Sequence, residues 1–188
     1  PELPDERKKR YINEYNLSNY DASVLTSDKS VSDFFDNVIK VDTSLKKSSK
    51  IVVNWITSEL FSLLNENDLE INNSPITPEN LGKLVKLIID DVISGKIAKD
   101  VLLEMFSTKK DPDKIIEDKG LKQVTDTSLI ETIVDDVIDE NQKMVEQYLS
   151  GKDKLLGFFV GQAMKKSKGK ANPKILNEIL KEKLSKKN

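Results

Sequence analysis

Residues 155–173 read LLGFFVGQAMKKSKGKANP, and this stretch decides how the C-terminal part of the chain folds. Its first ten residues are apolar or glycine apart from Gln162, which fits a helix with a buried side. Four lysines follow within six residues, at positions 165, 166, 168 and 170. Asn172 and Pro173 then form a typical helix start, an N-cap residue followed by proline at the first helical position. The stretch predicts an apolar helix docked on its own domain, a basic loop and a new helix.

The rest of the chain has the same helical periodicity. Apolar residues recur at spacings of three and four, and signals of β-strands are scarce. In the first part of the chain we expect a helix at 4–15, a second beginning after a Ser18 cap, a third beginning after Ser27 or Asp28, and a long helix at 43–65 with Trp55 on its core face. Further helices are expected from Thr77 to residue 93, through 97–106 and at 112–120. The last four are expected at 128–140, at 141–150, at 152–168 and from residue 173 onward. The pattern is weak at 121–127. The predicted fold is all-α: a helical domain at residues 1–118, followed by a three- to four-helix tail domain at residues 119–188.

The composition excludes several classes of chemistry. The chain has no cysteine and no histidine. Ser-His-Asp triads, Cys-His dyads and metal sites built from thiolate or imidazole are therefore impossible within it. The longest nearly uninterrupted apolar stretch, 155–164, is about half of the roughly 20 residues that a bilayer helix needs, so we expect no membrane span.

Two kinds of motif in the chain resemble functional sites only superficially. A phosphate-binding loop needs a glycine five residues before Gly95, where Asp90 stands, and a hydroxyl residue after Lys96, where Ile97 stands. We therefore interpret Gly95 as a turn between helices. The acidic pairs 90–91, 135–136 and 139–140 point roughly 100° apart on a helix, so they predict solvated helix faces. We expect no catalytic residue and no metal site in this chain.

Charge is distributed unevenly along the sequence. Residues 1–118 carry 16 basic against 22 acidic side chains, a net −6, whereas residues 119–188 carry 14 against 10, a net +4. Residues 152–188 alone carry 11 lysines against three acids, a net +8. Such an asymmetry is typical of a polyanion-binding end, and a solvated lysine-rich tail is the alternative.

The lysines around residue 168 are the candidate binding residues. Dipole compensation at a helix C-terminus explains one or two of them, and the rest, with the nearby Lys152, Lys154 and Lys174, point to phosphate. The candidate set for RNA contact is Lys152, Lys165, Lys166, Lys168, Lys170, Asn172 and Lys174. Without arginine or interleaved aromatics in the basic run, recognition of the shape and backbone of a folded RNA is favoured over base reading.

Gly157 and Gly161 lie on one face of the predicted apolar helix. Each costs up to about 1 kcal/mol relative to alanine inside a helix, so close backbone packing is the expected compensation. Either a neighbouring helix packs against the two glycines, which Phe158 and Phe159 favour, or a nucleic-acid backbone approaches them.

Several segments together resemble a known family. They are PELPDERKKRY at 1–11, YDASVLTSD at 20–28, NWI at 54–56, SGKIAK at 94–99, GLKQ at 120–123 and the stretch from Gly157 to Pro173. They are similar to the B subunit of the amidotransferase that converts Glu-tRNA(Gln) or Asp-tRNA(Asn) to the amide form, and they occur in the order found in that family. The resemblance covers essentially the whole chain.

The resemblance implies a fold and a function. The family's B subunit has an N-terminal cradle, which binds ATP and magnesium and receives ammonia released from glutamine by the A subunit, then a helical domain and a tail similar to the YqeY family. The present chain resembles only the last two parts, so we expect a piece of a longer protein without a cofactor of its own.

The implied partners are tRNA(Gln) or tRNA(Asn) and the A and C subunits, in the cytoplasm. The tail is implied to hold the outer corner of the tRNA. The alternative is a subunit-assembly module that makes no direct contact with RNA.

Overall fold

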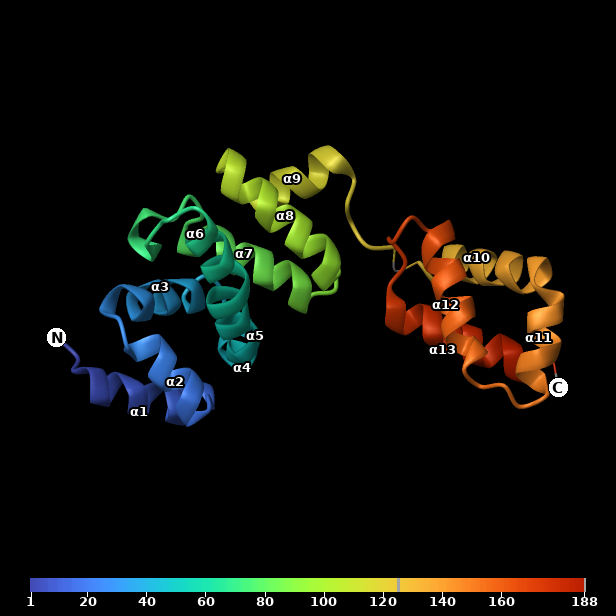
Figure 1. The fold of residues 1–188 in the computed structure, drawn as a ribbon, viewed down its shortest axis with the longest axis horizontal. Coiled ribbons are helices and arrows are strands. Elements are labelled where there is room, and N and C mark those ends of the chain that lie inside the picture. The colour runs from blue at the N-terminus through green and yellow to red at the C-terminus, as the bar shows by residue number, and fades with distance from the viewer. Residues whose placement is uncertain (125, 188) are drawn as a thin grey trace. The chain divides into compact units, whose positions relative to one another are not determined.

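The computed structural model describes residues 1–124 and 126–187 and contains two compact units, Pro1–Gly120 and Leu121–Asn188 (Figure 1). The division falls two residues after the predicted boundary, at Gly120, whose φ of 58° ends the preceding helix in the left-handed conformation. All regular structure within the described residues is helical, so the all-α prediction is confirmed.

The first unit begins with three helices: α1 (Pro4–Tyr15), α2 (Asn19–Thr26) and α3 (Lys29–Ile39). The predicted Ser18 cap is confirmed, because its hydroxyl accepts from the Asp21 amide at 3.0 Å. Of the two candidates before α3, Asp28 is the cap. Tyr11 of α1 is fully buried with its ring 4.9 Å from that of Phe35, an edge-to-face pair that joins α1 to α3.

The prediction of one continuous helix at 43–65 is wrong. The chain forms four helical pieces in succession: α4 (Ser44–Lys47), α5 (Ser49–Asn54), a π-helical segment η1 (Trp55–Leu60) and α6 (Phe61–Glu66). The break lies at Ser48, whose ψ of 28° is not helical, and directly after it the Ser49 hydroxyl donates to the Tyr15 carbonyl at 2.7 Å. Trp55 is buried, as predicted for a core residue.

The first unit continues with a 3-10 turn η2 (Ile71–Asn73) and the helices α7 (Pro78–Ile89), α8 (Gly95–Thr108) and α9 (Pro112–Lys119). Here the prediction that Gly95 forms the turn is wrong. Helix α7 ends at Ile89, the left-handed Asp91 (φ 56°) reverses the chain, and Gly95 is the first residue of α8, capped by Ser94. The acidic pair 90–91 therefore lies in this turn and not on a helix face.

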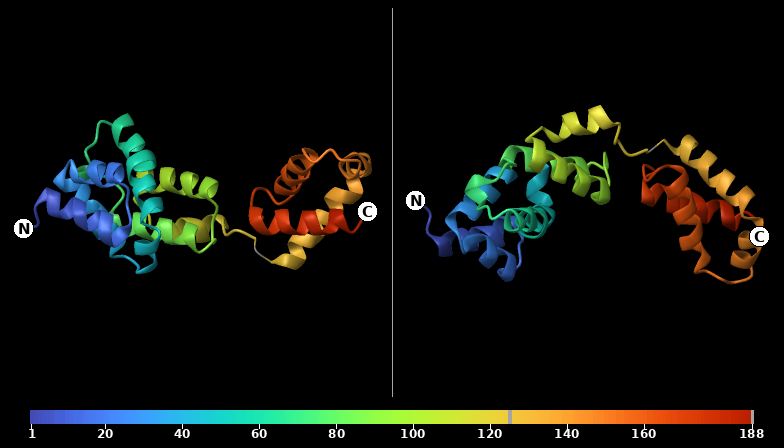
Figure 2. Two further views of the ribbon diagram at one scale, coloured as in Figure 1. Left: turned by 90° about the horizontal axis from the view of Figure 1, so that it is seen from below. Right: turned by 45° about the horizontal axis from the view of Figure 1, so that its top comes forward.

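The second unit consists of α10 (Thr127–Glu140), α11 (Gln142–Leu149), α12 (Leu155–Lys166) and α13 (Pro173–Ser185) (Figure 2). Helices α10, α12 and α13 pack on one another, and α11 packs on α12 and α10. Phe159, Ala163, Leu176 and Leu180 are fully buried between them. No helix among the described residues has the length and apolarity to cross a membrane.

Candidate nucleic-acid interface

One side of α12 faces solvent and carries no bulky side chain along its middle. Lys154, Gly157, Gly161 and Lys165 follow one another at spacings of three, four and four, and all four are exposed. Residues with these spacings share a helix face, which spans about 16 Å at 1.5 Å per residue. Phe159 and Ala163 on the opposite side are buried in the core. We call this row of four residues the glycine face.

The glycine face corrects one prediction. A Cβ atom added at Gly157 or Gly161 meets no atom within 4 Å in the described part of the chain. No neighbouring helix therefore packs against the two glycines there, and the helix-packing explanation of their presence is wrong. The flanking Phe158 instead lies partly buried at the core, with its ring 5.6 Å from that of Phe159.

The connection from α12 to α13, residues 167–172, has a defined backbone, and we call it the lysine loop. Each of its backbone N–H groups donates to an acceptor: Ser167 to Ala163, Lys168 to Lys165, Gly169 to Met164, Lys170 to Ser167, Ala171 to the Ser167 hydroxyl and Asn172 to Val124. Lys168 adopts a left-handed φ of 56°, which costs a residue other than glycine roughly 1–2 kcal/mol. The surrounding hydrogen bonds hold this conformation.

The predicted lysines differ in their surroundings. Lys165, Lys168 and Lys174 are exposed, Lys170 is half-buried, and none of the four has an ion-pair partner among residues 1–124 and 126–187. These four lie around the junction of α12 and α13. Lys152 is also exposed but precedes the other end of α12, whose first residue Leu155 lies about 15 Å from Lys165 along the helix axis.

Lys166 is held by the protein itself. Its ammonium group lies 2.8 Å from a carboxylate oxygen of Glu140 on α10, and this hydrogen bond raises the pKa of Lys166. Lys183 of α13 pairs likewise with Asp135 of α10 at 2.7 Å. Both side chains are oriented toward α10, which makes Lys166 a weaker candidate for RNA contact than its neighbour Lys165.

Asn172 has a structural role. Its side chain is 6% exposed, and Oδ1 accepts from the amides of Lys174 and Ile175 at 3.0 and 3.1 Å. Nδ2 donates to Gln123 Oε1 at 3.3 Å. The predicted cap of α13 is present, but the same contacts remove Asn172 from the exposed candidate set.

A family model described as the GatB domain matches residues 33–184, most of the chain, including nearly all of the second unit and the first unit from residue 33 onward. The chain belongs to the GatB family. Similar relatives are the B subunits of the aspartyl/glutamyl-tRNA(Asn/Gln) amidotransferases of Rickettsia rickettsii (54% identical), Alkalilimnicola ehrlichii (52%) and Pelagibacter ubique (50%). Each alignment covers 98% of this chain but only 37–38% of the relative. The chain thus spans little more than a third of the length of these GatB relatives, and the resemblance stated from sequence is confirmed.

Three residues at or near the candidate interface were not predicted as part of it. Lys154 was one of the lysines that point to phosphate but was left out of the candidate set, although its spacing from Gly157 and Gly161 places it on their face. Gln123 and Val124, at the start of the second unit, contact the lysine loop through a hydrogen bond and an isolated parallel β-bridge. No sequence pattern indicates these contacts, because the partners lie almost 50 residues apart.

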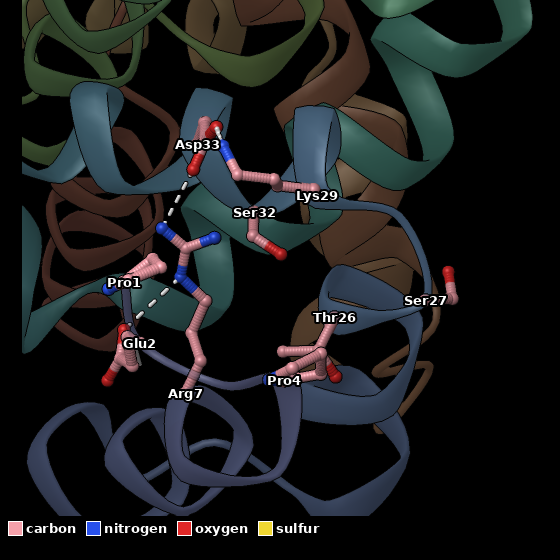
Figure 3. Close-up of a pocket in the computed structure, with 9 residues that line it drawn as sticks. All are labelled: Pro1, Glu2, Pro4, Arg7, Thr26, Ser27, Lys29, Ser32 and Asp33. Atoms are coloured by element: carbon pink, nitrogen blue, oxygen red, sulfur yellow. Dashed lines mark hydrogen bonds and ion pairs between the residues drawn. The ribbon is translucent and has the colours of Figure 1, made fainter.

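The helical unit of this GatB-family chain also contains a pocket of about 350 Å³, lined by Pro1, Glu2, Pro4, Arg7, Thr26, Ser27, Lys29, Ser32 and Asp33 (Figure 3). Its charged groups neutralise one another. Arg7 lies 3.3 Å from Glu2 and 2.8 Å from Asp33, and Lys29 lies 2.7 Å from Asp33.

The ion pairs in this pocket disfavour acid–base chemistry by its carboxylates. The hydrogen bond from Arg10 lowers the pKa of Glu2, and that from Lys29 lowers the pKa of Asp33. A general acid at neutral pH needs the opposite shift, toward the working pH. The part of the chain that is described contains no group of three or more acidic side chains placed to hold a metal ion.

Proposed function

We propose that this chain is the tRNA-holding part of the B subunit of an aspartyl/glutamyl-tRNA amidotransferase, a ligase that takes its amide nitrogen from glutamine. In this proposal the tail unit binds the sugar–phosphate backbone of tRNA(Gln) or tRNA(Asn). The observation that carries it is the glycine face, two bare and exposed glycines between Lys154 and Lys165.

The geometry of this face suits a polyanion backbone. Without side chains at Gly157 and Gly161, a sugar–phosphate strand can approach the helix closely, while lysines at each end supply charge. Lysine is a point charge without arginine's planar fork, and both arginines of the chain lie in the helical unit, at positions 7 and 10. Contacts of this kind position RNA by backbone and shape and give a strongly salt-dependent affinity.

The acidic helix α10 also favours RNA binding at α12 and the lysine loop. It carries five exposed carboxylates and no basic residue: Glu131, Asp135, Asp136, Asp139 and Glu140. Repulsion by these groups disfavours RNA on α10 and leaves α12 and the lysine loop as the attractive surface.

The proposal extends to the parts of the enzyme that this chain does not contain. We place the ATP- and magnesium-dependent chemistry outside residues 1–188, with no cofactor and no catalytic residue here, and we infer assembly with the A and C subunits in the cytoplasm. The names of the relatives, each a B subunit of a tRNA amidotransferase, support the assembly with other subunits.

A matched pair of double variants tests the RNA contact. Lys165→Gln with Lys168→Gln removes two exposed lysines without carboxylate partners, and Lys166→Gln with Lys183→Gln removes two that are paired with α10. Both doubles change the net charge equally. Titration of the chain with tRNA at several salt concentrations should show the log–log slope falling by about 1.4–1.8 in the first double, since each phosphate contact contributes about 0.7–0.9. The second double should stay near wild type.

Equal slopes for both doubles and wild type would refute the assignment. If tRNA affinity also stays normal while the first double fails to assemble with its partner subunits on gel filtration, the subunit-assembly alternative replaces it.

A further inference from the structure

The start of the second unit, residues 121–124, is hydrogen-bonded to the lysine loop. Val124 N–H donates to the Lys170 carbonyl, and Asn172 N–H donates back to the Val124 carbonyl at 2.9 Å, forming a single parallel bridge between Val124 and Ala171. One residue earlier, the Gln123 side chain accepts from Asn172 Nδ2 at 3.3 Å. Three hydrogen bonds thus fasten the end of the loop to Gln123 and Val124.

These hydrogen bonds lie at the end of the lysine loop, where the backbone is most restricted. Ala171 is fully buried and Asn172 almost so, which fixes the chain directly after Lys170. On the other side of Lys170, Lys168 and Gly169 both have positive φ, at 56° and 75°. A left-handed lysine persists only where its surroundings hold it. The loop's other hydrogen bonds are internal, reach back to α12 or cap α13, so Gln123 and Val124 are the partners outside these two helices that hold the loop's end.

We propose that Gln123 and Val124 are positioning residues, which set the direction of Lys168 and Lys170 for the RNA backbone without touching RNA themselves. This inference rests on the proposed function, because it assigns these lysines their orientation for tRNA. A solely structural role would predict something different: a loss of stability that lowers binding in proportion, whether or not the two lysines are present.

The test uses backbone chemistry at position 124 in the whole chain. Val124→Pro removes the N–H that donates to Lys170, and Val124→Ile keeps it and serves as the matched control. Gln123→Leu removes only the side-chain acceptor, so it keeps the test decisive if the proline variant does not fold. The readouts are hydrogen exchange of the Asn172 amide, thermal unfolding, and the salt dependence of tRNA binding.

The expected result has two parts. In Val124→Pro, hydrogen exchange of the Asn172 amide becomes about tenfold faster or more. The log–log salt slope of tRNA binding falls by up to about 1.4–1.8, the contribution of two phosphate contacts. In a background that already carries Lys168→Gln and Lys170→Gln, Val124→Pro lowers the slope no further, because the lysines it positions are gone. Gln123→Leu shows the same non-additivity with smaller changes, and Val124→Ile matches wild type.

Two results would overturn the inference. One is faster exchange at Asn172 with an unchanged salt slope; the other is an equal loss of slope from Val124→Pro with and without the two lysines. Failure of the proposed function itself looks different, since Lys165→Gln with Lys168→Gln then binds tRNA like wild type while the bridge is intact.

Discussion

Replacing Gly157 and Gly161 by alanine should make the tail unit more stable and weaken its binding to RNA. Glycine inside a helix costs about 0.5–1 kcal/mol relative to alanine, because the unfolded chain loses more backbone freedom on folding. The added Cβ atoms meet nothing within 4 Å in the described chain, so no steric term opposes the gain. The double substitution should therefore raise the free energy of unfolding by about 1–2 kcal/mol.

The size of this gain is measurable. For a unit of 60–100 residues, 1 kcal/mol shifts Tm by roughly 4–8 °C, and the unit Leu121–Asn188 falls in that range. Thermal unfolding of the chain should show the tail transition rising by roughly 4–16 °C while that of the helical unit stays in place. In tRNA titrations the same variant should bind more weakly, because two methyl groups now stand where the RNA backbone is proposed to approach.

Gly82 provides the contrasting case in the same molecule. A Cβ there would lie 2.6 Å from Cγ2 and 2.8 Å from Cβ of Val41, and 3.2 Å from the Val38 carbonyl oxygen. Gly82→Ala should therefore destabilise the helical unit by about 1–3 kcal/mol through overpacking, without affecting the tail transition. The reasoning fails if Gly157→Ala with Gly161→Ala lowers the Tm of the tail, since some group must then occupy the glycine face in the free protein.

Further predictions concern individual contacts. Lys168→Gly should relieve the left-handed strain and stabilise the tail by about 1 kcal/mol in denaturant unfolding, yet lower the salt slope of tRNA binding by about 0.7–0.9; a less stable variant would contradict the strain argument. Asn172→Ala should cost the tail about 0.5–2 kcal/mol, as loss of an N-cap does; weaker tRNA binding at every salt concentration with no change in stability would restore Asn172 as an RNA ligand. Hydrogen bonds from Lys29 and Arg7 lower the pKa of Asp33 in the folded state. The ionised Asp33 therefore stabilises the fold fully above the ordinary carboxylate pKa near 3.8, and this stabilisation is lost as the pH falls through the lower folded value. The Tm of the helical unit should fall on acidification below about pH 4, and less steeply in Asp33→Asn.

The sequence predicted those elements whose signals are local. Helix α1 has the predicted bounds, Pro4–Tyr15, because proline at its start and two acids in its first turn act within the helix itself. The break at Ser48 could not be predicted in this way, since the neighbouring Ser49 bonds to Tyr15, 34 residues away. Likewise, the spacing of Gly157 and Gly161 revealed that they share a face but not which side of α12 would be buried.

The sequence predicted that the candidate site is basic, but not which of its lysines are paired with carboxylates. The net charge of +8 over residues 152–188 treats every lysine alike, whereas folding brings carboxylates against three of them: Lys166, Lys183 and Lys186. Two of those carboxylates belong to α10, so their positions follow from tertiary packing and are invisible in the sequence of the basic run.

The same pairing explains why a helix as acidic as α10 is compatible with binding RNA. Asp135 and Glu140 hold lysines of α13 and α12 at the helix contacts, where those lysines help to join the bundle. Exposed ion pairs of this kind contribute little to stability, about 0–1 kcal/mol each, so their larger effect is on where free charge remains. Among the lysines of residues 152–187 that remain unpaired, five lie around the glycine face and the lysine loop: Lys154, Lys165, Lys168, Lys170 and Lys174. Neutralising Asp135 and Glu140 by substitution to Asn and Gln should therefore release Lys183 and Lys166 and strengthen tRNA binding at low salt. The preference of the tRNA for the exposed face of α12 over α10 should then decline.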